Sequence, residues 1–281
     1  ASIPSSVNSS STFSVFNKAT YCLIKLKSGS LRILLKSSLD KASSSTLIGS
    51  LPCNSGSKSE GLANWKAPDA WHKKSVNELK SWNEYVDKES GQTNQKLPSY
   101  AHAVGAIYRN SDPTDIAVTA AGGLVGEVVQ IWRPRELNTH ETEWGFSCMS
   151  YEISGALGIK MANPDKEVIA FIGDGSYLLY NSDIYSSVIT DNKLIIIVCD
   201  NGGHAVINRL QLFKGGKEFN CLFESSNTKK LVGVNFAKHA ESMGAKSEEV
   251  SSIEELEEAF KRAKKSKVTY VISIKLIPIN G

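Results

Sequence analysis

Two short apolar segments, each followed at once by a glycine-bounded polar turn, constrain the fold of this chain more than any other feature. Residues 168–172 have the sequence VIAFI, and residues 173–176 after them have GDGS. Residues 194–199 have LIIIVC, and residues 200–203 after them have DNGG. Uninterrupted apolar runs of this length are typical of strands that are buried on both faces of a parallel sheet. The two segments therefore predict neighbouring strands inside one domain.

Strands and helices alternate along the rest of the chain from about residue 98. Further apolar runs predict strands at 116–120 and 268–276. Helical spacing of apolar residues predicts helices at 98–109, 149–162, 176–189 and 235–243. Ser251 and Glu254 form a predicted capping box before one more helix. This alternation predicts an α/β fold in which helices cover both faces of a parallel sheet.

The first 59 residues differ in composition from the rest. They hold 18 serines, seven Lys or Arg residues and one acid, Asp40. Such a composition is typical of an organelle transit peptide, although the chain starts with Ala1 and roughly 60 residues is long for a presequence. A disordered linker and a stretch left by truncation or mis-joining of a longer gene are the alternatives. We expect a serine-rich, poorly ordered segment at 1–63 and the α/β domain at 64–281.

Charge and cysteine content exclude several classes of function. Lys and Arg total 32 against 29 Asp and Glu, and this net charge of +3 argues against nucleic acid or an anionic membrane as a partner. The longest apolar run, Leu194–Cys199, is far shorter than the ~20 residues of a membrane-spanning helix. The five cysteines are scattered without a CxxC pair, which favours a reducing compartment, the cytoplasm.

The polar residues that follow the two apolar strands are suited to hold a metal ion. The 25 residues between Gly175 and Asn201 are enough for one helix and a return to a neighbouring strand. Asp174 and Asn201 should therefore lie side by side at the carboxyl edge of the sheet. Carboxylate and amide oxygens suit Mg²⁺, whose other positions are commonly filled by phosphate oxygens and water. A helix that starts at Ser176 would offer N–H groups to the same phosphate, so the pattern predicts a magnesium–diphosphate site, with two ordinary turns as the alternative.

Longer stretches around these residues resemble a known superfamily. Residues 173–203, GDGSYLLYNSDIYSSVITDNKLIIIVCDNGG, resemble the thiamine-diphosphate motif of the thiamine-dependent enzymes. The flanks are similar to the 3D-(3,5/4)-trihydroxycyclohexane-1,2-dione hydrolases of myo-inositol catabolism, in SYAHAVGAIYR, VTAAGGLVGE, WGFSCMSYEISGALGIKMANPDKEVIAFIGDGSY and AVINRLQ. The resemblance runs from about residue 64 to the end. It implies the pyrophosphate-binding domain of a carbon–carbon bond hydrolase, with an acetolactate-synthase-like carboligase and a non-catalytic binding or assembly fragment as the alternatives.

The resemblance assigns roles to individual residues at the carboxyl edge. It implies that the Mg²⁺ ligands are the Asp174 carboxylate, the Asn201 amide and the backbone carbonyl of Gly203. Thiamine diphosphate would contact the same turns and the loop after the first strand of the domain. The predicted contacts are Gly173, Gly175, Ser176, Asn201, Ala121 and Gly122.

The segment before the second predicted helix carries the remaining implied contacts to the cofactor. Met149 stands where the family has an apolar side chain that bends thiamine, and a plain core methionine is the alternative. The carbonyl of Ser147 stands where the family accepts a hydrogen bond from the 4′-amino group. Ser150 stands where we expect glycine, and Gly202 and His204 also depart from the family pattern. These departures put the shape of the pocket mouth in doubt.

The catalytic groups are unknown from the sequence. In the family, a glutamate on a separate pyrimidine-binding domain activates the cofactor, and nothing in residues 1–63 resembles that domain. We expect it to come from another chain or a missing N-terminal region, the protein to form homo-oligomers, and this chain alone to be inactive. His204 is a candidate acid–base group, with an exposed loop histidine as the alternative. Three further residues could face the small cyclic dione substrate, with ordinary surface charge as the alternative: His140, Glu141 and Glu143.

Overall fold

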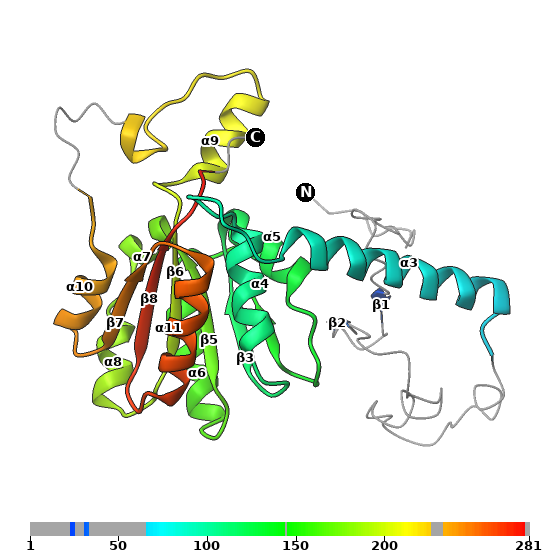
Figure 1. Ribbon diagram of the computed structural model, residues 1–281, viewed down its shortest axis with the longest axis horizontal. Coiled ribbons are helices and arrows are strands. Elements are labelled where there is room, and N and C mark those ends of the chain that lie inside the picture. The colour runs from blue at the N-terminus through cyan, green and yellow to red at the C-terminus, as the bar shows by residue number, and fades with distance from the viewer. Residues whose placement is uncertain (1–22, 26–30, 34–65, 144, 226–232, 279–281) are drawn as a thin grey trace, which may run out of the picture. The chain divides into compact units, whose positions relative to one another are not determined.

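The computed structural model describes five stretches of the chain, residues 23–25, 31–33, 66–143, 145–225 and 233–278 (Figure 1). The chain divides into two units, Ala1–Tyr85 and Val86–Gly281, and the predicted site lies wholly in the second. The predicted boundary at residues 63 and 64 stays a prediction.

Two short strands and most of one helix make up the described part of the first unit. β1 (Leu23–Lys25) and β2 (Leu31–Ile33) pair antiparallel. Helix α3 (Asp69–Glu89) starts in this unit and ends in the second. The rest of the predicted serine-rich segment lies outside the described residues.

The second unit is built on a six-stranded sheet in which every pairing is parallel. The strand order is β4-β3-β5-β6-β8-β7. The strands are β3 (Ile116–Thr119), β4 (His140–Thr142), β5 (Val168–Gly173), β6 (Ile195–Asp200), β7 (Lys246–Val250) and β8 (Tyr270–Lys275). The predicted α/β class with a parallel sheet is confirmed.

Helices cover both faces of this sheet, as the sequence predicts (Figure 1). One face carries α4 (Tyr100–Asn110), α5 (Gly122–Ile131) and α11 (Ile253–Lys265), where α4 packs against both of the others. The opposite face carries α6 (Tyr151–Ala162), α8 (Asp183–Ile189) and α10 (Phe236–Ser242). At the carboxyl edge lie α7 (Asp174–Leu179), α9 (Ala205–Phe213) and the short 3₁₀ turn Phe223–Ser225.

The two central strands are buried along nearly their whole length because helices lie on both sides of them. In β5, all residues from Val168 to Ile172 are fully buried. Alternate residues point to opposite faces, so Val168, Ala170 and Ile172 share one core cluster with Ile153 of α6. This packing explains why an uninterrupted apolar run, rather than an alternating one, marks these strands.

Several predicted boundaries are wrong, each for a local reason. The helix predicted at 176–189 is two helices, α7 and α8, and the Asn181 side chain donates to Tyr177 O across the break (2.8 Å). The helix predicted from residue 149 begins at Tyr151, because Ser150 has φ +77°, outside the α-helical region. In place of the capping box predicted at Ser251 and Glu254, the N-cap is Ser252, and the Glu255 side chain accepts a hydrogen bond from Ser251 N (2.8 Å).

The cap of α11 is formed by Ser252, whose hydroxyl accepts a hydrogen bond from Glu255 N (3.1 Å). Similarly, α4 begins at Tyr100 rather than at residue 98, and Ser99 forms its capping box with His102. The edge strands β4 and β7 were not predicted at all. Their sequences, HET and KSEEV, carry the polar side chains of strands that are partly exposed.

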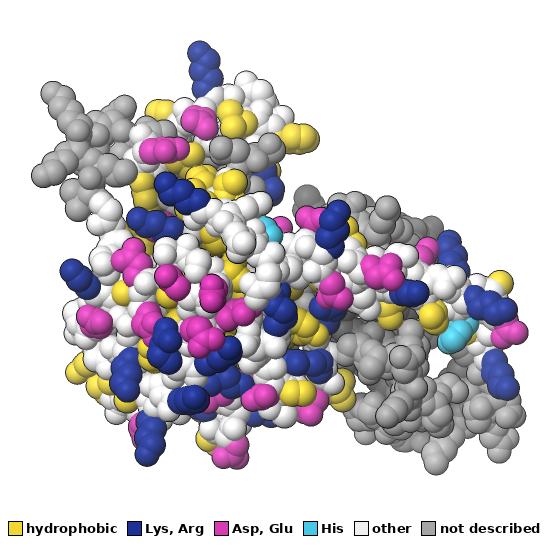
Figure 2. All heavy atoms as spheres, in the orientation of Figure 1, with side chains coloured by type: hydrophobic (Ala, Val, Ile, Leu, Met, Phe, Trp, Pro, Cys, Tyr) yellow, Lys and Arg dark blue, Asp and Glu magenta, His cyan; other side chains and the backbone are white. Residues whose placement is uncertain are grey.

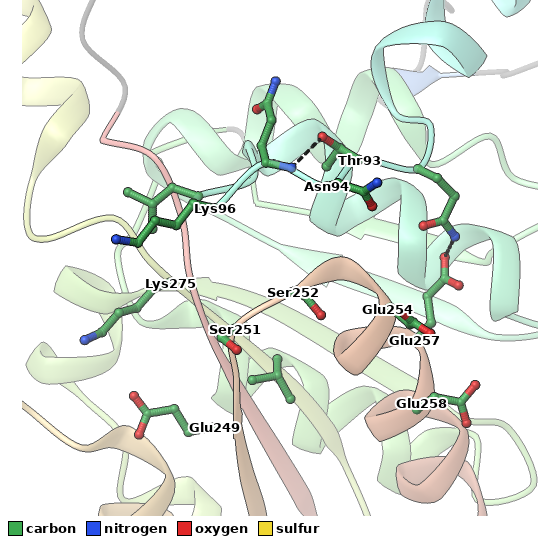
Figure 3. Close-up of a pocket in the computed structure, with 14 residues that line it drawn as sticks. Thr93, Asn94, Lys96, Glu249, Ser251, Ser252, Glu254, Glu257, Glu258 and Lys275 are labelled. Atoms are coloured by element: carbon green, nitrogen blue, oxygen red, sulfur yellow. Dashed lines mark hydrogen bonds between the residues drawn. The ribbon is translucent and has the colours of Figure 1, made fainter.

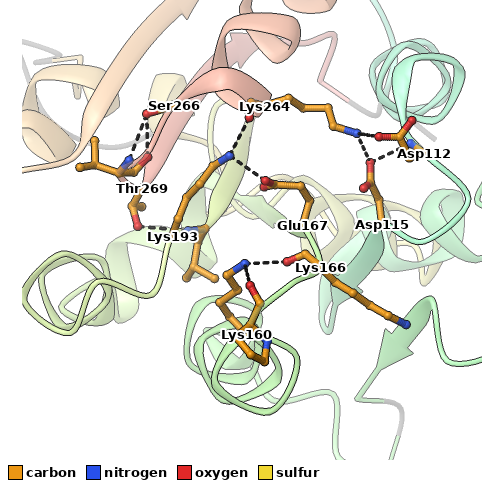
Figure 4. Close-up of polar contacts among 12 residues, drawn as sticks. Asp112, Asp115, Lys160, Lys166, Glu167, Lys193, Lys264, Ser266 and Thr269 are labelled. Atoms are coloured by element: carbon orange, nitrogen blue, oxygen red, sulfur yellow. Dashed lines mark hydrogen bonds and ion pairs between the residues drawn. The ribbon is translucent and has the colours of Figure 1, made fainter.

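The amino ends of the central strands are joined by ion pairs (Figure 4). Lys264 at the end of α11 lies 2.6 Å from Asp112 and 2.7 Å from Asp115. Lys193, just before β6, pairs with Glu167 (2.9 Å) and donates to the carbonyl of Lys264 (3.0 Å). These contacts neutralise charge at the amino edge of the sheet.

On the outer surface, basic and acidic side chains are interspersed over the face shown in Figure 2. Hydrophobic side chains are exposed on α9, with Leu210 at 50% and Phe213 at 79%. Within the described ranges, no helix combines the length and the apolar character needed to cross a membrane.

Candidate functional site

The candidate site lies at the point of the sheet where successive chain connections leave in opposite directions. From β3 the chain crosses to β4 on one side, and then returns to β5 on the other side of β3. In doubly wound parallel sheets such a reversal opens a crevice at the carboxyl ends of the strands, where ligands bind. The predicted cofactor and metal contacts follow β3, β4, β5 and β6, the strands at and beside this reversal.

The three predicted metal ligands meet at this edge. β5 and β6 are adjacent and in register, with Gly173 opposite Cys199, so the next residues project from neighbouring strand ends. One terminal atom of the Asn201 carboxamide lies 3.2 Å from Asp174 Oδ1 and 2.9 Å from the carbonyl oxygen of Gly203. Asp174 also accepts hydrogen bonds from Gly175 N (2.8 Å) and Gly203 N (2.6 Å). The predicted adjacency of the two strand ends is therefore present.

The spacing of these atoms fits a Mg²⁺ ion. Neighbouring ligands of an octahedral ion with metal–oxygen distances of 2.0–2.1 Å are about 3.0 Å apart. If the Asn201 atom that faces Asp174 is the oxygen, three acceptors converge and need a cation; if it is the nitrogen, it donates to both neighbours. Among the described residues, no group of three or more His, Cys, Asp or Glu side chains could hold a metal ion, and the predicted set of one carboxylate, one amide and one carbonyl is not such a group.

Burial makes the Asp174 carboxylate sensitive to nearby charge. Its side chain is 1% exposed, and burial together with the negative charge of Asp200 raises the pKa of Asp174 above its usual range. The two backbone N–H donors lower the pKa only in part. A divalent cation at this point would favour the ionised form, because an opposite charge stabilises a carboxylate.

Two glycines lie where the turns approach each other closely; the nearest atom belongs to the backbone at Gly203 and to the His204 side chain at Gly175. Gly203 has φ +134°, and a Cβ there would lie 2.5 Å from the carbonyl oxygen of Cys221. Gly175 is covered by His204, because a Cβ at Gly175 would lie 2.6 Å from that imidazole ring. His204 thus packs directly against a residue of the predicted magnesium–diphosphate site, while its catalytic role stays a prediction.

The segment around Cys221 was missed by sequence reasoning. His204 N donates to Cys221 O (2.7 Å) and Phe223 N donates to Gly202 O (2.9 Å), forming an antiparallel bridge between Gly203 and Leu222. These hydrogen bonds join main-chain atoms, so they place no requirement on the side chains of residues 221–223. The sequence therefore carries no motif for this segment.

Tyr100 was also missed, and it contacts a predicted metal ligand. It is the first residue of α4, it is 6% exposed, and its hydroxyl lies 2.6 Å from the Asn201 carboxamide. Burial and the anionic groups nearby raise the pKa of Tyr100, so the hydroxyl stays protonated. The SYAHAVGAIYR stretch was the available signal, but it does not show which residue reaches the site.

The loop after β3 is tied to the starts of α6 and α7. Ala121 N donates to Glu152 Oε1 (3.3 Å), and Ser150 Oγ donates to Ser176 O (2.8 Å). Glu152 is 1% exposed, its Oε2 has no hydrogen-bond partner among the described residues, and burial raises its pKa. At Gly122, which has φ +80°, nothing lies within 4 Å of where a Cβ would be. The predicted contacts at residues 121, 122 and 176 are thus connected through these two side chains.

The segment before α6 leaves Met149 partly open to solvent. Glu143 accepts hydrogen bonds from Phe146 N (2.8 Å) and Cys148 N (2.6 Å), and these bonds lower the pKa of Glu143. Met149 is 40% exposed, so it is not a fully buried core methionine. Ser150, where we expect glycine, has the left-handed conformation that glycine adopts without strain.

Of the residues predicted to face substrate, His140 lies in β4. Burial lowers the pKa of His140 to about 4, and its Nε2 lies 2.8 Å from the Thr142 hydroxyl. The ring is therefore neutral near pH 7. Its role toward a substrate stays a prediction, as do those of Glu141 and Glu143.

A separate hollow lies at the far edge of the sheet, beyond β8 (Figure 3). It has a volume of about 1030 Å³ and is lined by residues of the 92–97 loop, the end of β7 and the start of α11. Lys275 and several acids, among them Glu249 and Glu257, border it. Its lining contains none of the predicted cofactor-binding or metal-binding residues.

Comparison with known proteins adds independent information. Residues 120–274 match the family model described as thiamine pyrophosphate enzyme, C-terminal TPP binding domain. The chain is 39% identical over 199 residues to a 3D-(3,5/4)-trihydroxycyclohexane-1,2-dione hydrolase of Halalkalibacterium halodurans, and the match covers 70% of this chain and 30% of the relative. It is 37% identical over 196 residues to the protein of that name from Bacillus licheniformis, with the same coverage. The chain thus spans about a third of these relatives' length.

Two solved structures share the fold. A thiamine diphosphate-dependent 4-hydroxybenzoylformate decarboxylase of Rhodococcus jostii RHA1 matches with a TM-score of 0.59 at 18% identity, over 66% of this chain and 34% of that one. A benzoylformate decarboxylase from Polynucleobacter necessarius matches with a TM-score of 0.55 at 21% identity, over 68% and 35% of the two chains. At this level of identity the likeness concerns the fold alone.

Proposed function

This chain belongs to the thiamine pyrophosphate enzymes, whose C-terminal TPP-binding domain it carries, and on that premise we propose that its carboxyl edge binds thiamine diphosphate through Mg²⁺. The observation that carries the proposal is the convergence of Asp174, Asn201 and Gly203 at about the spacing of neighbouring Mg²⁺ ligands. Bound thiamine diphosphate would supply an electron sink for breaking a carbon–carbon bond.

Different residues of this chain would bind the ion, the diphosphate and the thiamine rings. Asp174 would neutralise part of the ion's charge, while the Asn201 amide and the Gly203 carbonyl would complete its protein ligands. Backbone groups at Gly122 and Ser176 are the proposed contacts to the diphosphate, since Gly122 leaves room for close approach. The exposed Met149 side chain would supply an apolar surface against the thiamine rings.

For the whole reaction we propose hydrolytic ring opening of a cyclic dione, because the relatives at 39% and 37% identity carry the name of such a hydrolase. The group that activates the cofactor would come from a pyrimidine-binding domain outside this unit, and the unit alone would bind the cofactor without turnover. Exposed apolar side chains at Phe146 (90%), Leu210 (50%) and Phe213 (79%) support association with such a domain or a second copy of the chain.

Calorimetric titration with thiamine diphosphate, with and without Mg²⁺, tests the binding proposal. Asp174→Asn should abolish Mg²⁺-dependent binding, because it removes the anionic ligand. Asp165→Asn is the matched control, since Asp165 is an exposed carboxylate in the turn that precedes β5. Binding that is the same with and without Mg²⁺, or that survives in Asp174→Asn as in Asp165→Asn, would overturn the proposal.

Turnover needs a separate assay, because binding alone does not identify the reaction. We expect no consumption of the dione by this chain alone, and consumption after the amino-terminal part of the Halalkalibacterium halodurans hydrolase is added. Turnover of pyruvate and not of the dione in the mixture would instead favour a carboligase.

A further inference from the structure

Tyr100 contacts the end of the Asn201 carboxamide that does not face the metal site. One terminal atom of this group faces Asp174 and Gly203, and the other lies 2.6 Å from the Tyr100 hydroxyl. Tyr100 is 6% exposed and Asn201 is 4% exposed, so water has little access to either group. The hydroxyl is therefore the hydrogen-bond partner of whichever end of the amide points away from the metal site.

Main-chain hydrogen bonds fix the position of Tyr100 relative to Asn201. After β8 the chain runs between the two, where Leu276 N donates to Asp200 O (2.7 Å) and Ile277 N donates to Pro98 O (3.0 Å). Asp200 precedes Asn201, and Pro98 lies just before the capped start of α4. The phenol and the amide, 101 residues apart in sequence, are thus held at hydrogen-bond distance by the framework.

We propose that Tyr100 is a positioning residue for Asn201: its hydroxyl accepts a hydrogen bond from the amide nitrogen and so directs the amide oxygen toward the divalent ion. The inference rests on the proposed function, because it requires that ion. Without the ion, the amide satisfies its neighbours best when reversed, with its nitrogen donating to Asp174 and Gly203 and its oxygen accepting from Tyr100. A hydroxyl can serve either end of the amide, because it both donates and accepts.

The hydrogen bond to Tyr100 is worth more with the ion than without it. A cation on the amide oxygen polarises the whole carboxamide and makes its N–H group a stronger donor. Groups that orient a metal ligand in this way typically change metal affinity about 10–100-fold when they are removed. Loss of the Tyr100 hydroxyl should therefore weaken binding of the ion while the aromatic ring keeps its packing.

The test is a titration of Mg²⁺ at fixed thiamine diphosphate, followed by calorimetry, with Tyr100→Phe and Tyr108→Phe. Tyr108 is on the same helix, and its hydroxyl donates to Arg133 O (3.3 Å), so the control removes a comparable group. We expect the Mg²⁺ concentration for half-maximal binding to rise about 10-fold or more in Tyr100→Phe and to stay near wild type in Tyr108→Phe. At saturating Mg²⁺ the Tyr100→Phe variant should regain the wild-type affinity for the cofactor.

Thermal unfolding without Mg²⁺ separates this role from a structural one, which would lower Tm without changing the Mg²⁺ requirement. An unchanged Mg²⁺ requirement in Tyr100→Phe, or an equal rise in Tyr108→Phe, would overturn the inference and leave the proposed function standing. Absence of Mg²⁺-dependent binding by the wild-type protein would overturn the proposed function, and the inference with it.

Discussion

Replacing Gly203 by alanine tests whether the turn after β6 has its shape for steric reasons. A Cβ at this position would lie 2.5 Å from Cys221 O and 3.2 Å from Leu222 Cα. Both are backbone atoms, so no side-chain rotation can relieve the overlap. Gly202 is a matched control, because it also has positive φ (+84°) but nothing lies within 4 Å of its Cβ position.

The expected magnitudes follow from these two environments. At Gly202, alanine brings only the strain of positive φ, about 1–2 kcal/mol. At Gly203, a φ of +134° is accessible essentially to glycine alone and costs about 2 kcal/mol in other residues. The displaced segment also loses the bonds His204 N to Cys221 O and Phe223 N to Gly202 O, each worth about 1 kcal/mol. We therefore expect Gly203→Ala to lower the free energy of unfolding by about 4 kcal/mol.

Urea denaturation gives the free energy of unfolding of each variant, and amide hydrogen exchange reports local opening. If the segment around Cys221 detaches without global unfolding, the amides of His204 and Phe223 should lose their protection in Gly203→Ala and keep it in Gly202→Ala. Equal losses of stability in the two variants, with both amides protected in each, would refute the steric reasoning.

Two further perturbations act on single residues around the site. Ser150→Ala should destabilise the protein by about 1 kcal/mol, because the hydrogen bond to Ser176 O is lost. Ser150→Gly should destabilise it by less, because glycine adopts φ +77° without strain. Equal losses of stability in urea denaturation would contradict this prediction. The pKa of His140 is lowered from 6.5 to about 4, so the unfolded chain takes up this proton first and stability falls as pH decreases from 6.5 to 4. In that window the wild type should lose about 3 kcal/mol more than His140→Gln, and parallel pH profiles of the two proteins would contradict the assignment.

The interior of the sheet was predictable from sequence, whereas its edges were not. Helices cover both faces of β5 and β6, so nearly every side chain of these strands is buried and apolar. The apolar runs at 168–172 and 194–199 can therefore be recognised as strands from the sequence. β4 and β7 have a neighbouring strand on one side only and partly exposed side chains, and their sequences are short and polar. Only the observed pairing identifies them as strands.

The candidate site likewise contains residues that the sequence predicted and residues that it did not. Asp174 and Asn201 follow two adjacent strands, so spacing along the chain was enough to predict that they meet, whereas Gly203 was assigned through the family resemblance. The contact with Tyr100 depends on how α4 packs, and a separation of 101 residues hides it from any local pattern. For Ser150, the sequence indicated a departure from glycine, but the reason, a positive φ, is a property of the backbone.

The two edges of the sheet differ in the groups that surround their buried charges, and this difference supports the proposed place of the ion. At the amino edge, Lys264 and Lys193 lie within 3 Å of Asp115 and Glu167, so the protein supplies its own counter-ions. At the carboxyl edge, Asp174 accepts hydrogen bonds from two backbone N–H groups, forms no ion pair with any described residue, and has a pKa raised by burial. A buried carboxylate without a cationic partner is costly unless a positive charge arrives from outside. The unfavourable electrostatics at this edge are therefore what a divalent cation would relieve, and the free energy so released would add to the affinity for the ion.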